Sequence, residues 1–279
     1  MYKYKLLIAY DGTHYSGWQV QPNGTSIQTL LQQALSTALR APTSLVGSGR
    51  TDAGVHALGQ VAHFTCGATF DARKLLLSLN GLLPLDIRAL ELNPVDPSFH
   101  ARYSAIGKVY RYHLQWNLNP FKQLYSLYVP TVLDIPLMQE GARLLLGRHD
   151  FTSFSNEADR GAAAKNPVRT LRRLDFIAEE GGMVLEFEGD GFLYKMVRNI
   201  VGTLLALGRG KISLEDIPII LAAKDRRCAK EAAPAHGLFL ARVEYALTSF
   251  QTSQNASHPE EHYFLAEDGA LNRSERDAP

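Results

Sequence analysis

The sequence predicts an α+β fold built from two similar halves. Between residues 4 and 92, apolar segments follow the order strand, helix, strand, strand, helix, strand, as judged from their spacing. The same order returns between residues 108 and 245. No residue-level similarity connects the two stretches, so the repeat rests on the order of elements alone. We expect the halves to form one largely antiparallel sheet flanked by helices, with a cleft between the halves.

The first half begins with a strand and a helix. Residues 4–10 form an apolar run that ends at Asp11-Gly12, a dipeptide typical of turns. A helix is expected next, because Thr25 and Gln28 have the spacing of a capping box. Apolar side chains then recur at helical intervals, namely Ile27, Leu30, Leu31, Ala34, Leu35, Ala38 and Leu39.

Two strands, a helix and a further strand complete the first half. Residues 44–47 and 60–66 have strand-like composition, and the glycine-rich stretch around Asp52 lies between them. That stretch is therefore expected to be a loop. Helical spacing covers residues 72–79, and a strand is expected at 87–92.

The second half repeats this order over a longer stretch of chain. Its expected elements are a strand at 108–116, a helix at 136–146, a strand pair at 171–178 and 183–188, a helix at 192–207 and a strand at 238–245. The β-α-β-β-α-β order of both stretches is that of ferredoxin-like units. We expect the halves to cover residues 1–105 and 106–247. Residues 248–279 are polar and of mixed charge, which predicts a disordered tail.

Charge and composition exclude several classes of protein. The net charge is +1, but the stretch from Phe250 onward holds two basic and six acidic residues, which leaves +5 on the rest. This excess permits an RNA-binding face if the cations cluster. No segment is apolar enough to span a membrane, and the first apolar run is too short for a signal peptide. Cys66 and Cys228 lack the spacing of a zinc site, so we expect a reduced, cytoplasmic protein.

The loop at residues 47–56 has the composition of a catalytic site. It combines three glycines and a proximal cation, Arg50, with the carboxylate of Asp52. Glycine lets the backbone approach a ligand closely, and Arg50 could hold Asp52 ionised or contact a phosphate. The same residues are also typical of an ordinary turn in which the Asp side chain caps its own backbone. Composition alone leaves both interpretations open.

Metal and nucleoside triphosphate sites have no signature in this chain. Four histidines lack a partner at the helical i+4 spacing of a metalloenzyme motif, namely His56, His63, His100 and His236. The glycine pattern near Asp52 does not end in Gly-Lys-Ser or Gly-Lys-Thr, as a phosphate-binding loop would. We predict no bound metal.

The same loop resembles the signature of the TruA family of tRNA pseudouridine synthases. Further blocks resemble that family in the same order along the chain. They are Tyr10-Asp11-Gly12-Thr13 with Tyr15 and Gly17-Trp18-Gln19, Phe99-His100-Ala101-Arg102, Lys108 with Tyr110 and Tyr112, Gly191 with Met196 and Arg198, and the block from Ala233 to Leu238. The resemblance spans roughly residues 4–245.

The resemblance implies a fold, a reaction and a partner. It implies a two-part α+β catalytic domain, a homodimer, and conversion of uridine to pseudouridine in the anticodon stem-loop of tRNA, at positions 38–40. The C1′–N1 bond must break, the uracil must rotate, and a C1′–C5 bond must form. Such an isomerisation needs no redox cofactor, and we expect none. By resemblance Asp52 is the catalytic carboxylate, either attacking C1′ or removing a sugar proton, and both roles require it to be ionised.

Further site residues follow from the matched blocks. Tyr110 is expected to stack on the extruded base, although its surroundings also fit an ordinary half-buried strand. Arg198, one turn after Tyr194 and Lys195 on the expected helix, could pair with Asp52 or a phosphate, or could be solvated. Basic residues expected to contact the RNA backbone are Arg50, Arg102, Lys108, Arg111 and Lys195.

Two other functions compete with a synthase. A nucleoside or glycoside hydrolase would release free base and would require a second carboxylate near Asp52, for which the sequence offers no candidate. A non-catalytic RNA-binding module would use aromatic strand residues such as Tyr110 and Tyr112 to bind RNA without altering it.

Overall fold

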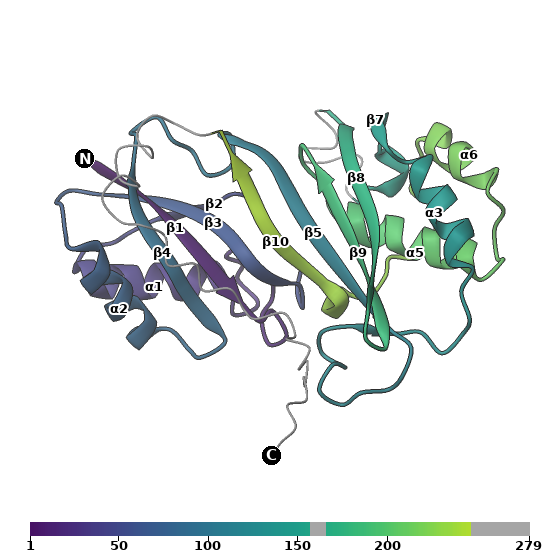
Figure 1. Ribbon diagram of the computed structural model, residues 1–279. Helices are drawn as coiled ribbons and strands as arrows, with labels where there is room; N and C mark the ends of the chain where they lie inside the picture. Colours follow the sequence, from purple (N-terminus) through teal and green to yellow (C-terminus); the bar gives the residue numbers. More distant parts are fainter. Residues whose placement is uncertain (157–165, 247–279) are drawn as a thin grey trace, which may run out of the picture. The chain divides into compact units, whose positions relative to one another are not determined.

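A ten-stranded sheet forms the framework of the protein (Figure 1). The computed structural model describes residues 1–156 and 166–246. Its strands are β1 (Tyr2–Tyr10), β2 (Leu45–Gly47), β3 (His56–Cys66), β4 (Ile87–Val95), β5 (Ala105–Gln115), β6 (Leu127–Tyr128), β7 (Gly147–Asp150), β8 (Val168–Glu179), β9 (Gly182–Gly189) and β10 (Leu238–Tyr245). The described α-helices are α1 (Ile27–Leu39), α2 (Ala72–Leu82), α3 (Ile135–Arg143), α5 (Met196–Gly208) and α6 (Asp216–Ala223).

The strand order confirms the predicted α+β fold. The main path through the sheet is β4-β1-β3-β10-β5-β9-β8-β7, with β2 paired to β3 and β6 paired to β5. The four strands β1 to β4 therefore have the order β4-β1-β3-β2, and β5, β8, β9 and β10 have the matching order β10-β5-β9-β8. Most pairs are antiparallel, and β10 joins the two sets by running parallel to β3. The boundary at residue 105 stays a prediction, and the expected tail lies outside the described residues.

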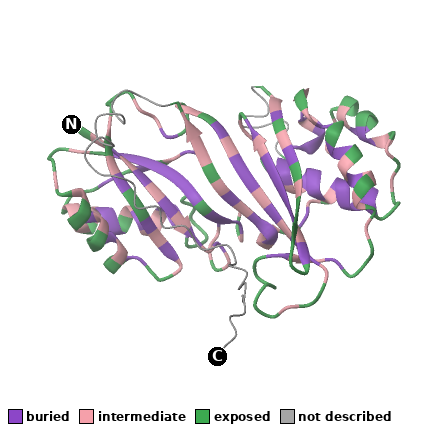
Figure 2. Cartoon of the chain, viewed as in Figure 1, coloured by how far each residue is buried: buried purple, intermediate pink, exposed green. Residues whose placement is uncertain are grey.

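Side chains on one face of the sheet build the core. Along β1 the buried positions alternate, as expected for a strand with one covered face. Helices α1 and α2 pack on the strands of the first half, and α3, α5 and α6 lie with those of the second (Figure 1). Almost the whole of α5 is buried (Figure 2). Both sets contribute to a single hydrophobic cluster.

The register brings two tyrosines from different halves onto the same face. Tyr10 pairs with Ala57, and Ala57 pairs with Leu240 on β10. Leu240 in turn pairs with Tyr110 on β5. Because directly paired residues point to the same side of a sheet, Tyr10 and Tyr110 share one face.

Two predicted helix starts were wrong. Ser26, not Thr25, caps α1, since its side chain accepts a hydrogen bond from the Thr29 amide. Gln28 is instead buried, and its amide donates to the carbonyl oxygen of Leu45 at 2.7 Å. The later helix, α5, begins at Met196 and not at residue 192, because Lys195 has a left-handed backbone (φ 59°) that cannot continue a helix.

Several short elements had no recognisable signal. α6 has only eight residues and contains a proline, and β6 and β7 have two and four residues. Such lengths are too short for a hydrophobic period to be read. Among the described residues, no helix is long and apolar enough to cross a membrane.

Candidate active site

Asp52 lies in the loop between β2 and β3, as the sequence predicted. The loop is anchored at its start, where the Ser48 amide donates to the carbonyl oxygen of Val61 at 2.7 Å. It closes in a turn, because the Val55 amide donates to the carbonyl oxygen of Asp52 at 3.1 Å. These backbone hydrogen bonds fix the direction in which the Asp52 side chain points.

The connection between β1 and α1 supports the Asp52 loop from the other side. The Trp18 amide donates to the carbonyl oxygen of Thr51 at 3.1 Å. Gly17 has a positive φ of 87°, and a Cβ atom there would lie 2.6 Å from the same oxygen. A Cβ atom at Gly12 would lie 2.1 Å from the carbonyl oxygen of Val55. Only glycine fits these two positions, which explains the glycines in the first matched block.

Arg198 pairs directly with Asp52. Its Nη1 donates to Oδ2 of Asp52 at 2.8 Å, and the two side chains are only 13% and 16% exposed. Its Nε donates to the carbonyl oxygen of Ala233 at 2.7 Å, while the Ala233 amide donates to the carbonyl oxygen of Arg198. Oδ1 of Asp52 makes no hydrogen bond to a described residue. The arrangement therefore holds a negative carboxylate beside a cation and leaves one oxygen available.

Tyr110 lies close to this pair. Burial, with smaller contributions from Tyr10 and Asp52, raises the pKa of its phenol well above the ordinary value. The ring is 8% exposed and meets Phe192 edge to face, with centroids 5.1 Å apart. Its hydroxyl makes no hydrogen bond to the described part of the chain. Tyr110 is thus a rigid, neutral aromatic group next to the carboxylate.

The remaining predicted cations lie in different surroundings. Arg50 is exposed and forms no ion pair with the described residues. Lys195 precedes α5, with its Nζ 5.3 Å from the ring centroid of Tyr194. Lys108 donates from Nζ to the carbonyl oxygen of Ser48 at 2.9 Å, at the start of the Asp52 loop.

Arg111 is not brought together with Asp52. It neighbours Tyr110 on β5, and successive side chains on a strand point to opposite faces. Its Nε donates to Oε2 of Glu186 at 2.6 Å on the adjacent strand β9. The sequence could not reveal this, because the pairing of β5 with β9 decides which carboxylate Arg111 meets.

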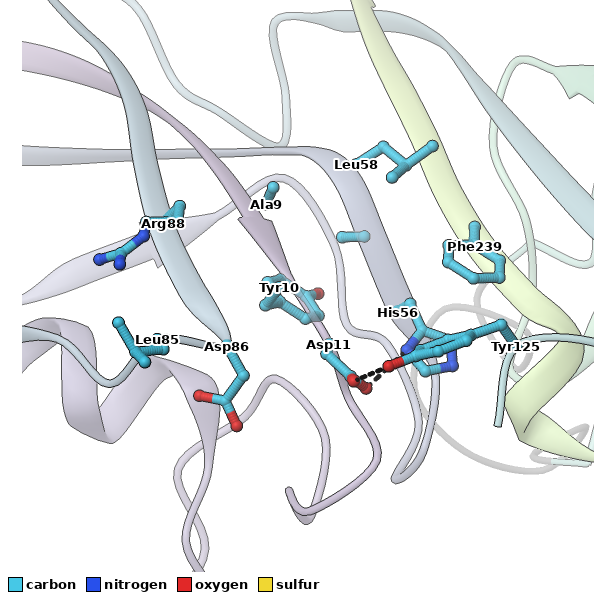
Figure 3. A pocket seen from close by; sticks show the side chains of 11 residues that line it. Ala9, Tyr10, Asp11, His56, Leu58, Leu85, Asp86, Arg88, Tyr125 and Phe239 are labelled. Atoms are coloured by element: carbon cyan, nitrogen blue, oxygen red, sulfur yellow. Dashed lines mark hydrogen bonds and ion pairs between the residues drawn. The ribbon is translucent and has the colours of Figure 1, made fainter. Parts of the chain in front are cut away.

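His56 has a position that sequence reasoning missed. Its Nδ1 accepts from the Gly12 amide at 3.1 Å and lies 3.0 Å from Oδ1 of Asp11 (Figure 3). Its Nε2 lies 3.1 Å from the carbonyl oxygens of both Leu124 and His236. Burial lowers the pKa of this imidazole, although Asp11 opposes the effect. His56 therefore connects three segments to the strand that directly follows the Asp52 loop.

A cavity of about 290 Å³ is lined in part by His56 (Figure 3). Tyr125 contributes to its wall and donates from its hydroxyl to Oδ2 of Asp11 at 2.8 Å. Asp52 does not line this cavity. Within residues 1–156 and 166–246, no cluster of three or more His, Cys, Asp or Glu side chains could hold a metal ion.

Comparison with known proteins identifies similar sequences over most of the chain. A family model described as tRNA pseudouridine synthase matches residues 6–104 and 142–246. The tRNA pseudouridine synthase A 1 of Protochlamydia amoebophila is 58% identical over 248 residues, which is 88% of this chain and 97% of that protein. Proteins named tRNA pseudouridine synthase A from an Exiguobacterium strain and from Chlamydia pneumoniae are 44% and 45% identical, each over 88% of this chain and over 98% and 93% of their own lengths.

Proposed function

This chain belongs to the tRNA pseudouridine synthase family, and from that premise we propose that it modifies uridines of the anticodon stem-loop with Asp52 as the catalytic carboxylate. The family consists of isomerases that convert uridine to pseudouridine, so the chain is a tRNA-modifying isomerase. The observation that carries the proposal is the Asp52–Arg198 ion pair beside the ring of Tyr110. The stem-loop as target is proposed from resemblance alone.

The reaction requires an ionised carboxylate at the sugar. The C1′–N1 bond breaks, the uracil rotates, and C5 bonds to C1′, while C5 loses a proton and N1 gains one. Nothing is oxidised, so the reaction needs no redox cofactor. Arg198 stabilises the negative charge of Asp52 through Oδ2, and Oδ1 is available to the ribose.

Two roles for Asp52 fit this geometry. The carboxylate can attack C1′ and form a covalent ester, or it can remove the C2′ proton and leave a glycal. A substrate deuterated at C2′ distinguishes them. A primary isotope effect on the cleavage step supports proton removal, and its absence supports nucleophilic attack.

Tyr110 is proposed to receive the extruded uracil. A base within a stem is inaccessible to the carboxylate, so it must leave the stack at a cost of a few kcal/mol. Stacking on an aromatic ring returns about 1–3 kcal/mol per base. The edge-to-face contact with Phe192 keeps the Tyr110 ring in one orientation for this purpose.

Basic residues around the site are proposed to contact the RNA backbone. We include Arg50, Lys195, Arg102 and Lys108. We leave out Arg111, because Glu186 already neutralises it. The resemblance also supports a homodimer, which light scattering of the purified protein would test, and a tRNA substrate supports a cytoplasmic location.

The direct test is conversion of an unmodified tRNA transcript without added cofactor. Wild type is expected to form pseudouridine in the anticodon stem-loop. Asp52→Asn keeps the size of the side chain but not its charge, and is expected to slow the reaction by at least about 10²–10⁴-fold. Asp175→Asn is the matched control, because Asp175 forms its ion pair with Arg173 on β8 and not with a residue of the site.

Either failure of this test has a clear meaning. Wild-type protein that binds the transcript but leaves every uridine unchanged would favour an RNA-binding function over catalysis. An Asp52→Asn protein with the wild-type rate would remove Asp52 from the mechanism.

A further inference from the structure

Three cations form a cluster, and one of them, Lys108, contacts the start of the Asp52 loop. Lys108 lies on β5, Arg102 precedes that strand, and Arg169 lies near the start of β8. None of them forms an ion pair with a carboxylate of the described residues, although eleven pairs between Lys or Arg and a carboxylate occur elsewhere in this part of the chain. Clustered cations are ordinarily paired with acids, so this arrangement indicates an anionic ligand.

Lys108 is the most buried member of the cluster. Burial, followed by the positive charges of Arg102 and Arg169, lowers its pKa to about 8. Its neighbours on the flanking strands are Gly189 and Val243, which do not titrate. The one hydrogen bond that its Nζ makes to a described residue goes to the carbonyl oxygen of Ser48. The ammonium group therefore keeps donors for a further partner.

Arg169 is held in place by the backbone around it. Its Nη1 donates to the carbonyl oxygens of Asn166 and Val168, at 2.8 and 2.6 Å. Its Nε lies 3.6 Å from the position that a Cβ atom at Gly191 would occupy. Burial lowers the pKa of Arg169, the negative charge of Asp190 opposes this effect, and the positive charge of Arg102 adds to it.

Lys108 lies close to both Tyr110 and the Asp52 loop. Lys108 precedes Tyr110 by two residues on the same strand, so both point to the same face about 6–7 Å apart. Ser48, which Lys108 contacts, precedes Asp52 by four residues. A nucleotide whose base stacks on Tyr110 therefore has its backbone within reach of Lys108.

We propose that Lys108, Arg102 and Arg169 bind one phosphodiester group of the tRNA strand beside the target uridine, and that Lys108 takes up a proton when this group binds. The inference rests on the proposed function. A phosphodiester carries one negative charge, which offsets the repulsion among the three cations. Lys108 is partly neutral at pH 8 in the free protein and becomes fully charged in the complex, because the phosphate favours the ammonium form.

Proton uptake on binding is measured by titration calorimetry with tRNA transcript at pH 8, in buffers of different ionisation enthalpy. The Asp52→Asn background allows binding without turnover. Uptake of about half a proton is expected, because a group of pKa about 8 is half protonated at that pH. Lys108→Arg keeps the charge but stays protonated throughout, so its complex should take up about half a proton less.

The salt dependence of tRNA affinity provides a second readout, which does not rely on a change in the protonation of Lys108. At pH 7, Lys108→Gln and Arg169→Gln should each reduce the slope of log Kd against log salt by about 0.7–0.9. Lys74→Gln is the matched control, since Lys74 is an exposed residue of α2 and should leave the slope unchanged.

Equal proton uptake with Lys108 intact and in the Lys108→Arg variant, together with unchanged salt slopes, would overturn the phosphate site. If wild type forms pseudouridine and these binding effects are absent, this site alone is wrong. If the binding effects appear but wild type forms no pseudouridine, the synthase proposal fails and the phosphate site stands.

Discussion

Arg198 donates a 2.8 Å hydrogen bond to Asp52 across 146 residues of sequence. The loop before β3 supplies the carboxylate, and the first turn of α5 supplies the guanidinium. The Ala233 carbonyl holds the other edge of the guanidinium, so its orientation is fixed on two sides. Contacts within the protein therefore hold the pair in one geometry.

Replacing Arg198 is expected to affect catalysis more than binding. Arg198→Met removes the cation that stabilises Asp52, and kcat should fall by about 10²–10³-fold. Arg198→Lys keeps the charge but cannot contact both Asp52 and Ala233, so it should recover only part of this loss. Single-turnover rates with tRNA transcript measure the effect. A wild-type rate for Arg198→Met would contradict a role for the ion pair.

Substitutions at Tyr110 are expected to show separately what the ring and the hydroxyl contribute to tRNA binding. Because the hydroxyl makes no hydrogen bond to the described residues, Tyr110→Phe should bind tRNA with a Kd within about two-fold of wild type. Tyr110→Ala removes the stacking surface and should weaken the complex by about 1–3 kcal/mol. Filter binding in the Asp52→Asn background tests both. Equal affinities of the Ala and Phe variants would argue against stacking.

His56 is expected to position the Asp52 loop. His56→Ala removes the acceptor for the Gly12 amide and the donor to the Leu124 and His236 carbonyls, so the loop should lose its orientation. We expect kcat to fall about 10–100-fold with a much smaller change in KM. His56→Gln, which can replace the Nε2 donor, should recover part of kcat. A change confined to thermal stability would indicate a purely structural role.

His63 should make stability depend on pH. Burial, followed by His100 and Lys3, lowers its pKa from 6.5 to about 4. The unfolded chain therefore binds more protons between these values, and stability is lost as the pH falls from about 6.5 to 4. His63→Asn can still accept from the Ala101 amide but does not titrate. In urea unfolding, the free energy of unfolding of His63→Asn should therefore fall by about 2–3 kcal/mol less than that of wild type over this pH range. Parallel curves for the two proteins would contradict the prediction.

Two glycine substitutions should have opposite effects on the stability of the protein. Gly17→Ala places a Cβ atom 2.6 Å from the Thr51 carbonyl oxygen at a positive φ, which should cost at least about 1–2 kcal/mol and reduce activity. Gly81→Ala meets no atom within 4 Å in α2 and should stabilise the protein by about 0.5–1 kcal/mol. Thermal unfolding of both variants measures the contrast. A neutral Gly17→Ala would show that the loop can rearrange.

Local patterns in the sequence predicted most of the secondary structure. The alternation in β1 and the helical spacing of α1 depend on neighbouring residues alone, and both elements were found at the expected positions. The errors were also local. Ser26 replaces Thr25 as the cap of α1, and the left-handed Lys195 delays α5. The conformation of a single residue sets the boundary of a helix. The spacing of apolar residues does not specify that conformation.

The sequence by itself determined the α+β class, the loop that carries Asp52 and the family, because short contiguous patterns specify each of them. Only the tertiary structure decided which distant side chains meet. Placement of β10 between β3 and β5 brings Tyr110 towards Asp52, and the packing of α5 brings Arg198 to it. The pairing of β5 with β9 turns Arg111 towards Glu186, and the pairing of β9 with β8 brings Arg169 towards Lys108. Contacts of this kind depend on strand order and register across the whole sheet, which no local pattern specifies.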